Sequence, residues 1–185
     1  MRKLLHDETA ALRLTAETAL LAPRHPVAVL LDNIRSLYNV GSVFRTCDGA
    51  RAARLYLAGH TPHPPRPEID KTALGATATV PWEHHARATD AVAAARAAGY
   101  TICVLEQTTA GIPYHALPRS RFPVCLVVGN EVTGVSAEVI AAADLALEIP
   151  MYGAKHSLNA AVACGIALFE AVRIWRSAPG GAQSS

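Results

Sequence analysis

The chain has 185 residues, of which 51% are hydrophobic and 17% charged, and its formal net charge is +2 at pH 7. This composition excludes a disordered or collagen-like chain, and the length fits one domain with a substantial core. A charge so close to zero permits a nucleic-acid ligand but does not indicate a strongly cationic binding face.

Four widely spaced cysteines have mostly small or apolar neighbours, and they are Cys47, Cys103, Cys125 and Cys164. Neither the CxxC nor the Cys–His spacing of a zinc site occurs, so we expect buried reduced thiols and no bound metal. Asp7 and Glu8 lie where a signal peptide would be apolar. No apolar run approaches membrane-spanning length, so we expect a cytoplasmic protein that makes no membrane contact.

Predicted helices and strands alternate along the chain. In chain order they are a helix within 3–22, a strand at 27–32, a helix at 39–50, a strand at 54–58, a helix at 89–98, strands at 100–106 and 123–129, a helix at 136–143, a strand at 145–149 and a helix at 157–176. The proline-rich segment 60–67 is predicted to be a loop, and the last residues a disordered tail. This alternation predicts an α/β fold with a mostly parallel sheet covered by helices.

A first polar segment directly follows the predicted strand at 27–32. It contains the pattern Asn39-x-Gly41-x-x-x-Arg45 at the start of a predicted helix. Gly41 permits close backbone approach near the helix N-terminus, where free N–H groups can receive a phosphate. An ordinary capped helix whose arginine reaches solvent fits the same residues, so this motif alone leaves both interpretations open.

A second segment follows the apolar strand at 123–129. Gly129 and Gly134 lie five residues apart in a turn that gives a flat ligand access to the backbone, and Glu131 places a carboxylate there. The turn lacks the Gly-Lys-Ser/Thr ending of a P-loop, and no GxGxxG dinucleotide fingerprint occurs in the chain. A plain strand–turn–helix connection capped by Ser136 is the alternative.

A third segment joins the strand at 145–149 to the last helix. Residues 149–151 (IPM) end the strand, and residues 157–159 (SLN) begin the helix, with Asn159 in its first turn facing back toward the loop. The small residues that follow let another backbone or a subunit approach closely. A capped, alanine-rich helix without a ligand is the alternative.

In this order the three segments resemble the motifs of the SpoU (TrmH-like) RNA 2′-O-ribose methyltransferases of the SPOUT superfamily. Asn39-x-Gly41-x-x-x-Arg45 resembles motif 1, Gly129-Asn130-Glu131-x-x-Gly134-Val135-Ser136 resembles motif 2, and Ile149-Pro150-Met151 with Ser157-Leu158-Asn159 resembles motif 3. The resemblance covers about residues 25–176, taken as the methyltransferase domain between an N-terminal helical extension at 1–24 and the tail at 177–185. Asn130 and Val132 replace the Ser and Gly of many relatives, and we expect a changed fit without loss of activity.

The resemblance implies a C-terminal trefoil knot, S-adenosylmethionine bound in the knot, and a homodimer whose active sites draw on both subunits. Its interface is expected on the motif 1 helix and the long C-terminal helix. The residues implied for the cofactor pocket are Leu105, Gly129, Ile149, Met151, Ser157 and Leu158. Those implied for catalysis are Arg45, Asn39, Glu131, Ser157 and Asn159.

The resemblance also implies roles for these catalytic residues. Arg45 clamps the phosphate and ribose of the RNA or acts as general base, although a guanidinium with a pKa above about 12 seldom releases its proton. Asn39, Ser157 and Asn159 orient the ribose and Arg45, while Glu131 holds this network. The expected substrate is tRNA or rRNA.

Two other functions fit parts of the pattern. An RNA-binding scaffold of the same fold without catalysis is one, although the presence of Asn39, Arg45, Ser157 and Asn159 argues against it. A nucleotide-binding oxidoreductase is the other, and it lacks its glycine fingerprint here.

Overall fold

The computed structural model describes residues 1–11 and 14–177. The helices are α1 His6–Ala11, α2 Ala16–Leu21, α3 Leu37–Gly49, α4 Pro67–Ala73, α5 Ala88–Ala97, α6 Ala137–Ala141 and α7 Ala160–Arg176. The strands are β1 His25–Asp32, β2 Ala52–Ala58, β3 Trp82–His85, β4 Thr101–Leu105, β5 Ile112–Pro113, β6 Val124–Val128 and β7 Leu145–Glu148.

All seven strands form one sheet in the order β3-β2-β1-β6-β4-β7-β5, and the paired strands are parallel. The predicted α/β fold is therefore confirmed. The chain moves outward from β1 to β2 and β3, and the later strands fill the other side of β1. The order thus reverses between β1 and β6, where the loops after parallel strands leave a crevice for ligands.

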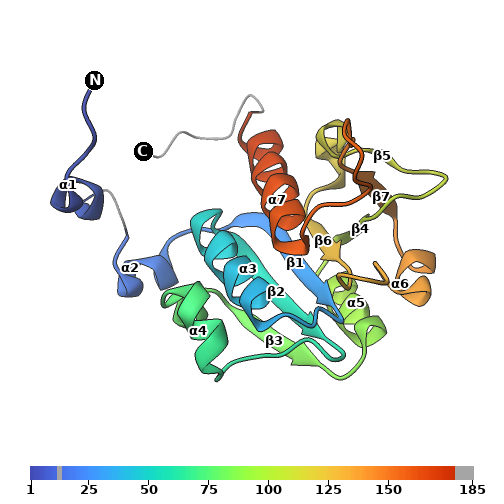
Figure 1. Ribbon diagram of the computed structural model, residues 1–185, viewed down its shortest axis with the longest axis horizontal. Helices are drawn as coiled ribbons and strands as arrows, with labels where there is room; N and C mark the ends of the chain where they lie inside the picture. The colour runs from blue at the N-terminus through green and yellow to red at the C-terminus, as the bar shows by residue number, and fades with distance from the viewer. Residues whose placement is uncertain (12–13, 178–185) are drawn as a thin grey trace.

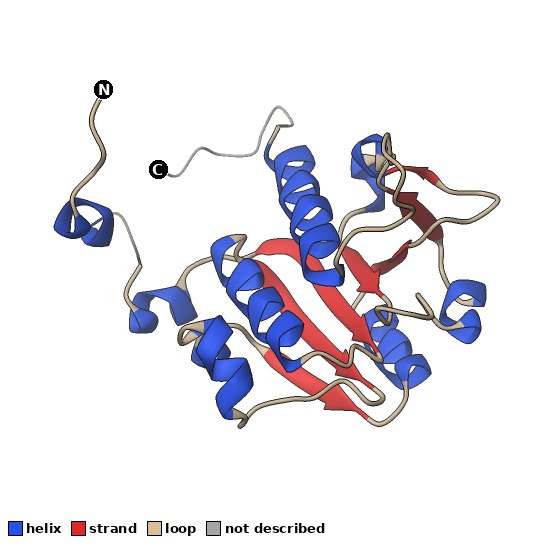
Figure 2. Ribbon diagram, in the orientation of Figure 1, coloured by secondary structure: helices blue, strands red, loops and turns tan. Residues whose placement is uncertain are grey.

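Helices cover both faces of the sheet (Figures 1 and 2). One core joins α3, α4 and α7 to the sheet, and a second core on the opposite face joins α5 and α6 to it. The central strands are continuous apolar runs because both of their faces are covered, and residues 27–31 of β1 are fully buried. All four cysteines are free and buried, and burial raises the pKa of the Cys103 thiol to about 12.

The two longest helices begin at capping residues that the sequence pattern placed differently. Ser36 caps α3, with its Oγ accepting the Asn39 amide at 3.3 Å, so Asn39 lies inside the helix. Asn159 caps α7, and its Oδ1 accepts the amides of residues 161 and 162 at 3.0 and 3.3 Å. The predicted helix start at Ser157 is therefore wrong, and that residue belongs to the preceding loop.

Gly41 serves packing between helices. A Cβ on it would lie 2.0 Å from Thr72 Oγ1 and 2.3 Å from the Ile69 carbonyl oxygen of α4. The close approach predicted at this glycine is confirmed, and the backbone that approaches it is that of α4.

Some elements differ from the prediction. The proline-rich loop runs directly into α4, whose first residue is Pro67, a favoured residue at a helix start. The edge strands β3 and β5 escaped the hydrophobic pattern because they are only four and two residues long. The single helix expected within 3–22 is wrong, since Leu14 and Thr15 are not helical and Thr15 caps the separate α2.

The described residues contain neither a membrane-spanning helix nor a cluster of metal-binding side chains. The predicted disordered tail falls outside the described residues from 178 onward. Among residues 1–11 and 14–177, no helix is long and apolar enough to cross a membrane. The same residues hold no group of three or more His, Cys, Asp or Glu side chains that could bind a metal ion. The trefoil knot stays a prediction.

Candidate functional site

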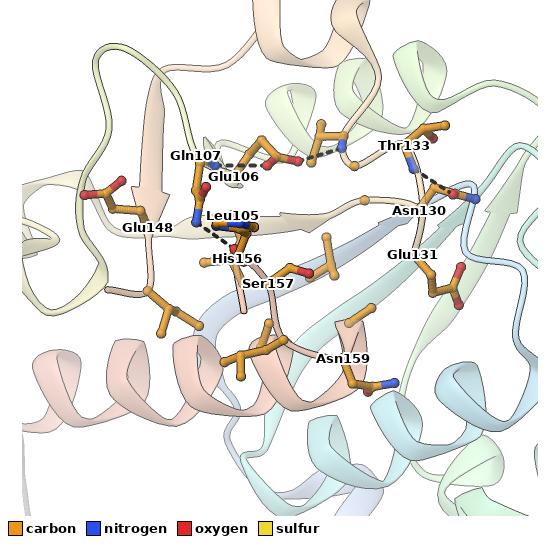
Figure 3. Close-up of a pocket in the computed structure, with 18 of the residues that line it drawn as sticks. Leu105, Glu106, Gln107, Asn130, Glu131, Thr133, Glu148, His156, Ser157 and Asn159 are labelled. Atoms are coloured by element: carbon orange, nitrogen blue, oxygen red, sulfur yellow. Dashed lines mark hydrogen bonds between the residues drawn. The ribbon is translucent and has the colours of Figure 1, made fainter. Parts of the chain in front are cut away.

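A cavity of about 590 Å³ lies beyond the carboxyl ends of β4, β6 and β7 (Figure 3). Three segments far apart in the sequence supply its walls, namely 105–107 after β4, 128–135 after β6 and 147–160 after β7. All residues expected to contact a cofactor line it, and they are Leu105, Gly129, Ile149, Met151, Ser157 and Leu158. Of the residues expected to act in catalysis, Glu131, Ser157 and Asn159 line it as well.

The wall after β6 is a tight turn. Asn130 and Gly134 exchange two backbone hydrogen bonds of 3.0 Å, and the Asn130 side-chain Oδ1 accepts the amides of Val132 and Thr133 at 2.9 and 3.2 Å. A Cβ on Gly129 would lie 2.1 Å from the Val135 nitrogen, so this position has no room for a side chain. The turn therefore presents backbone atoms to the cavity.

Glu106 and Gln107 brace this turn against the loop after β7, and the sequence analysis did not single them out. Glu106 Oε2 accepts the Val135 amide at 3.0 Å, while its Oε1 accepts the Gln107 amide at 3.0 Å. The Gln107 side chain donates to the His156 carbonyl oxygen at 2.9 Å, as Figure 3 shows. Two polar residues directly after an apolar strand were the available signal.

A chain of hydrogen bonds links the three motifs at the edge of the cavity. The Glu131 carboxylate accepts the backbone amides of Arg35 and Ser36 at 3.0 and 3.2 Å and the Asn39 side-chain amide at 2.9 Å. Asn39 Oδ1 in turn accepts the Asn159 side-chain amide at 3.1 Å. Asn159 therefore caps α7 with its oxygen and reaches α3 with its nitrogen.

This arrangement keeps Glu131 ionised. Partial burial disfavours the carboxylate, but the hydrogen bonds from Arg35, Asn39 and Ser36 outweigh burial and hold the pKa of Glu131 below its ordinary value. A carboxylate with a lowered pKa is a weak base, so its contribution lies in holding neighbouring groups.

Two expected site residues, Asn39 and Arg45, do not line the cavity. Asn39 reaches it through hydrogen bonds to lining residues, whereas Arg45 does not. Arg45 lies on an exposed part of α3 and is absent from the cavity walls. Its side chain makes no hydrogen bond or ion pair with any residue that the structure describes. Asn39 lies two turns earlier on α3 and contacts the cavity residues Glu131 and Asn159.

The matched region of the chain decides its family. Residues 26–169, well over half of the sequence, match the SpoU rRNA Methylase family. The chain belongs to the SpoU family. Membership makes the protein an S-adenosylmethionine-dependent RNA methyltransferase that acts on a ribose 2′-hydroxyl, so the predicted family, enzyme class and cofactor are confirmed.

Three relatives show how far the likeness extends. A tRNA (guanosine(18)-2′-O)-methyltransferase from Thermus thermophilus is 29% identical over 171 residues, which cover 91% of this SpoU-family chain and 86% of the relative. The 23S rRNA (guanosine-2′-O-)-methyltransferase RlmB from Vibrio cholerae is 31% identical, with 80% of this chain and 59% of the relative covered. An AdoMet-bound rRNA methyltransferase from Sinorhizobium meliloti has a TM-score of 0.75 and 32% identity, with 82% of this chain and 57% of that one covered. The chain therefore spans less than two thirds of the last two proteins.

The small residues of α7 in this SpoU-family chain make contacts within the same chain. Ala160 and Ala163 line the cavity, and Ala160 and Ala161 pack against the core. A Cβ on Gly165 would lie 3.7 Å from Thr46 Cγ2 of α3, so the two helices pack closely within one chain. These small residues were expected to let another backbone or a subunit approach closely, and within one chain α3 is such a backbone.

Proposed function

We propose that this SpoU-family enzyme methylates a ribose 2′-hydroxyl of tRNA or rRNA in the cytoplasm, with the methyl donor in the cavity and the acceptor ribose beside Asn39 and Asn159. The juxtaposition of the cavity with the hydrogen-bonded chain Glu131–Asn39–Asn159 supports the proposal best. The printed names of the Thermus and Vibrio relatives support the two RNA classes. The domain is proposed to span residues 25–176, with 1–24 as an N-terminal extension.

The cavity fits S-adenosylmethionine in size and chemistry. Its volume of about 590 Å³ lies in the range of about 300–1,000 Å³ that is typical of cofactor sites. Leu105, Ile149 and Leu158 offer apolar contacts, whereas the turn that follows Gly129 offers backbone donors and acceptors. With Met151 and Ser157, these residues would hold the cofactor, which supplies an electrophilic methyl group when bound.

The chain's own residues position the acceptor. The amides of Asn39 and Asn159, joined at 3.1 Å, are proposed to orient the ribose in line with the methyl group, together with the Ser157 hydroxyl. Glu131 fixes the loop before α3 and the Asn39 amide, and its lowered pKa argues against a role as proton acceptor. Arg45 is proposed to clamp the ribose and its phosphate.

We further propose a homodimer in which Arg45 of each subunit serves the cavity of the other. Arg45 is exposed and lies outside the cavity walls of its own chain, so a single chain lacks this group at its site. Tyr38 of α3 and Val162 and Phe169 of α7 are each about half exposed, at 52, 51 and 52%. A twofold contact through these two helices would bury them, and this symmetry is the commonest for homodimers.

Ribose methylation maps of total RNA from cells with and without this protein test the proposed substrate. We expect the loss of methylation at one or a few tRNA or rRNA positions when the protein is missing. Identical maps would contradict the proposal, whereas a loss confined to another RNA class would reassign the substrate.

A further inference from the structure

Two loops meet where the strand order of the sheet reverses. Residues 33–36 follow β1 and lead into α3, and residues 129–135 follow β6 and wall the cavity. The first loop lies on the proposed acceptor side, because Ser36 caps the helix that carries Asn39. One route between the methyl donor and the RNA therefore crosses between these two loops, beside the direct contact of Asn159 with Asn39.

The Asn130 side chain makes that crossing with both of its polar atoms. Its Oδ1 accepts the amides of Val132 and Thr133 and so fixes the turn at the cavity. Its Nδ2 donates to the carbonyl oxygen of Asn33 at 2.7 Å, and Asn33 is the first residue of the acceptor-side loop. One side-chain amide is thus hydrogen-bonded to both loops at once.

Asn33 is itself fixed, so a change at Asn130 is passed on and not absorbed. Asn33 adopts the left-handed conformation with φ of 57°, which asparagine tolerates better than most residues. Its side chain accepts the His60 amide at 3.0 Å and donates to Asp32 Oδ1 at 2.8 Å. Asp32 is 1% exposed, and its other oxygen accepts the Ser136 amide at 2.8 Å, at the far end of the second loop.

We propose that Asn130 is a positioning residue that couples occupation of the cofactor cavity to the geometry of the acceptor-side loop. The inference rests on the proposed function, because it assumes the methyl donor on one side and RNA on the other. A ligand that orders the turn at 130–134 favours one position of the Asn130 side chain. The side-chain amide of Asn130 then favours one position of residues 33–36. By reciprocity, RNA bound at that loop strengthens cofactor binding by the same factor.

The coupling needs a donor and an acceptor on one side chain. In Asn130→Asp, the acceptor for Val132 and Thr133 is retained, but a carboxylate oxygen faces the Asn33 carbonyl oxygen, so the link is lost while the turn survives. In Asn130→Ser, a hydroxyl can cap the turn but is too short to reach Asn33 as well. Both variants therefore lose the link and keep the turn, one with an acidic side chain and one with a neutral side chain, so an effect that they share is not due to the added charge.

Hydrogen exchange followed by mass spectrometry tests the link without RNA. S-adenosylhomocysteine is added to the full-length protein, and exchange is followed in the peptide that contains residues 33–40. In the wild type we expect exchange there to slow by about fivefold or more, the lower end of typical coupling between sites. At saturating S-adenosylhomocysteine, this protection should fall below about twofold in Asn130→Asp and Asn130→Ser, with melting temperatures close to that of the wild type.

Equilibrium dialysis of labelled S-adenosylhomocysteine, with and without small RNA from cells lacking the protein, tests the reciprocal effect. RNA should tighten binding by about fivefold or more in the wild type and not in the two variants. Glu138→Ser is the matched control, because this exposed side chain lies eight residues further along, and it should keep the wild-type response.

The outcomes separate this inference from the proposed function. If the wild type fails to bind S-adenosylhomocysteine, the proposed function falls. If the wild type binds it but shows neither protection at 33–40 nor tightening by RNA, the coupling is overturned. Variants that retain both effects would overturn the role of Asn130 specifically.

Discussion

At the scale of single residues, the site contains side chains that hold neighbouring groups in place through hydrogen bonds. Glu131 accepts three N–H groups from the loop before α3 and its first turn, which sets both the position of Asn39 and the charge of the carboxylate. Arg45 has the opposite character, since it is exposed and has no partner among the described residues. The Glu131 side chain therefore holds neighbouring groups in place, whereas the Arg45 side chain is exposed to solvent.

The variant Glu131→Gln should lower kcat by about tenfold while S-adenosylmethionine affinity changes little. Its amide NH₂ would replace one of the two accepting oxygens and so face either the donating amide of Arg35 or those of Ser36 and Asn39. Each hydrogen bond to a charged acceptor is worth roughly 1.5–3 kcal/mol before solvent screening reduces it. Steady-state kinetics with both substrates separates the effect on kcat from that on KM. Glu138→Gln removes the same charge from an exposed position and should retain wild-type kcat.

The pH dependence of this interaction has a definite sign. The pKa of Glu131 is lower in the folded protein than its ordinary value, so the carboxylate stabilises the fold above the unfolded pKa of about 4.3. That stabilisation is lost as the pH falls through the folded pKa. We therefore expect kcat between about pH 6 and 8 to show no inflection from Glu131. An inflection in this range that is present in the wild type and absent in Glu131→Gln would contradict the assignment of Glu131 as an ionised, holding group.

The variant Arg45→Ala should reduce methyl transfer by about a hundredfold with cofactor affinity nearly unchanged. Loss of one charge-assisted contact in a preorganised site is worth on the order of 3 kcal/mol. Arg45→Lys should restore little, because an ammonium group lacks the planar two-pronged geometry. Single-turnover assays on hypomethylated RNA measure the change, and a near-wild-type rate for Arg45→Ala would show that the arginine is an ordinary solvated helix residue.

At the scale of elements, glycine contacts set how closely the helices can pack. Gly41 lets α3 approach α4, whereas Gly49 at the end of the same helix has free space, its nearest would-be Cβ neighbour being Phe169 Cζ at 3.9 Å. These two glycines therefore make a matched pair within one element.

We predict that Gly41→Ala destabilises the protein by about 1–3 kcal/mol, because its methyl group would overlap Thr72 Oγ1 and the Ile69 carbonyl. Gly49→Ala should be neutral or stabilise by up to about 1 kcal/mol, since alanine is the better helix former. Urea unfolding of both variants measures the difference. Equal stabilities would show that α3 and α4 can separate without loss.

The elements also show what the sequence could and could not predict. The central strands and the loops after β1, β6 and β7 were predictable, because buried parallel strands are continuous apolar runs and the polar residues follow them directly. The edge strand β3 and the bracing pair Glu106–Gln107 were not, because each depends on contacts between segments distant in the sequence. The cap at Ser36 is a local contact, but Asn39 is an equally favoured capping residue, so the sequence alone did not decide between them. Arg45 was predicted for the site, yet its separation from the cavity of its own chain is a property of the assembled fold.

At the scale of the whole molecule, the reversal of strand order gathers three distant motifs at one edge of the sheet. Loops after β1, β6 and β7 meet there through the side chains of Glu131, Asn39 and Asn159. Arg45 is proposed to come from a second copy, which would make the dimer part of the site.

Mixed dimers test whether Arg45 acts across the interface. Alone, Arg45→Ala and Glu131→Gln subunits are expected to keep about a hundredth and about a tenth of the wild-type rate. Mixing them creates dimers in which one cavity has an intact Glu131 and an intact Arg45 from the other subunit. Random exchange should recover about a quarter of wild-type activity, because half of the dimers are mixed and each has one complete site. If Arg45 serves its own cavity, mixing should recover nothing.

The most direct measurement of the central claim is methyl transfer by the purified protein. S-adenosylmethionine labelled in its methyl group is incubated with RNA from cells lacking the protein, in the presence of a chelator, and the RNA is digested to nucleosides. We predict that label appears in a 2′-O-methylated nucleoside and in no base. Label confined to bases, or the absence of label from every RNA fraction, would contradict the account.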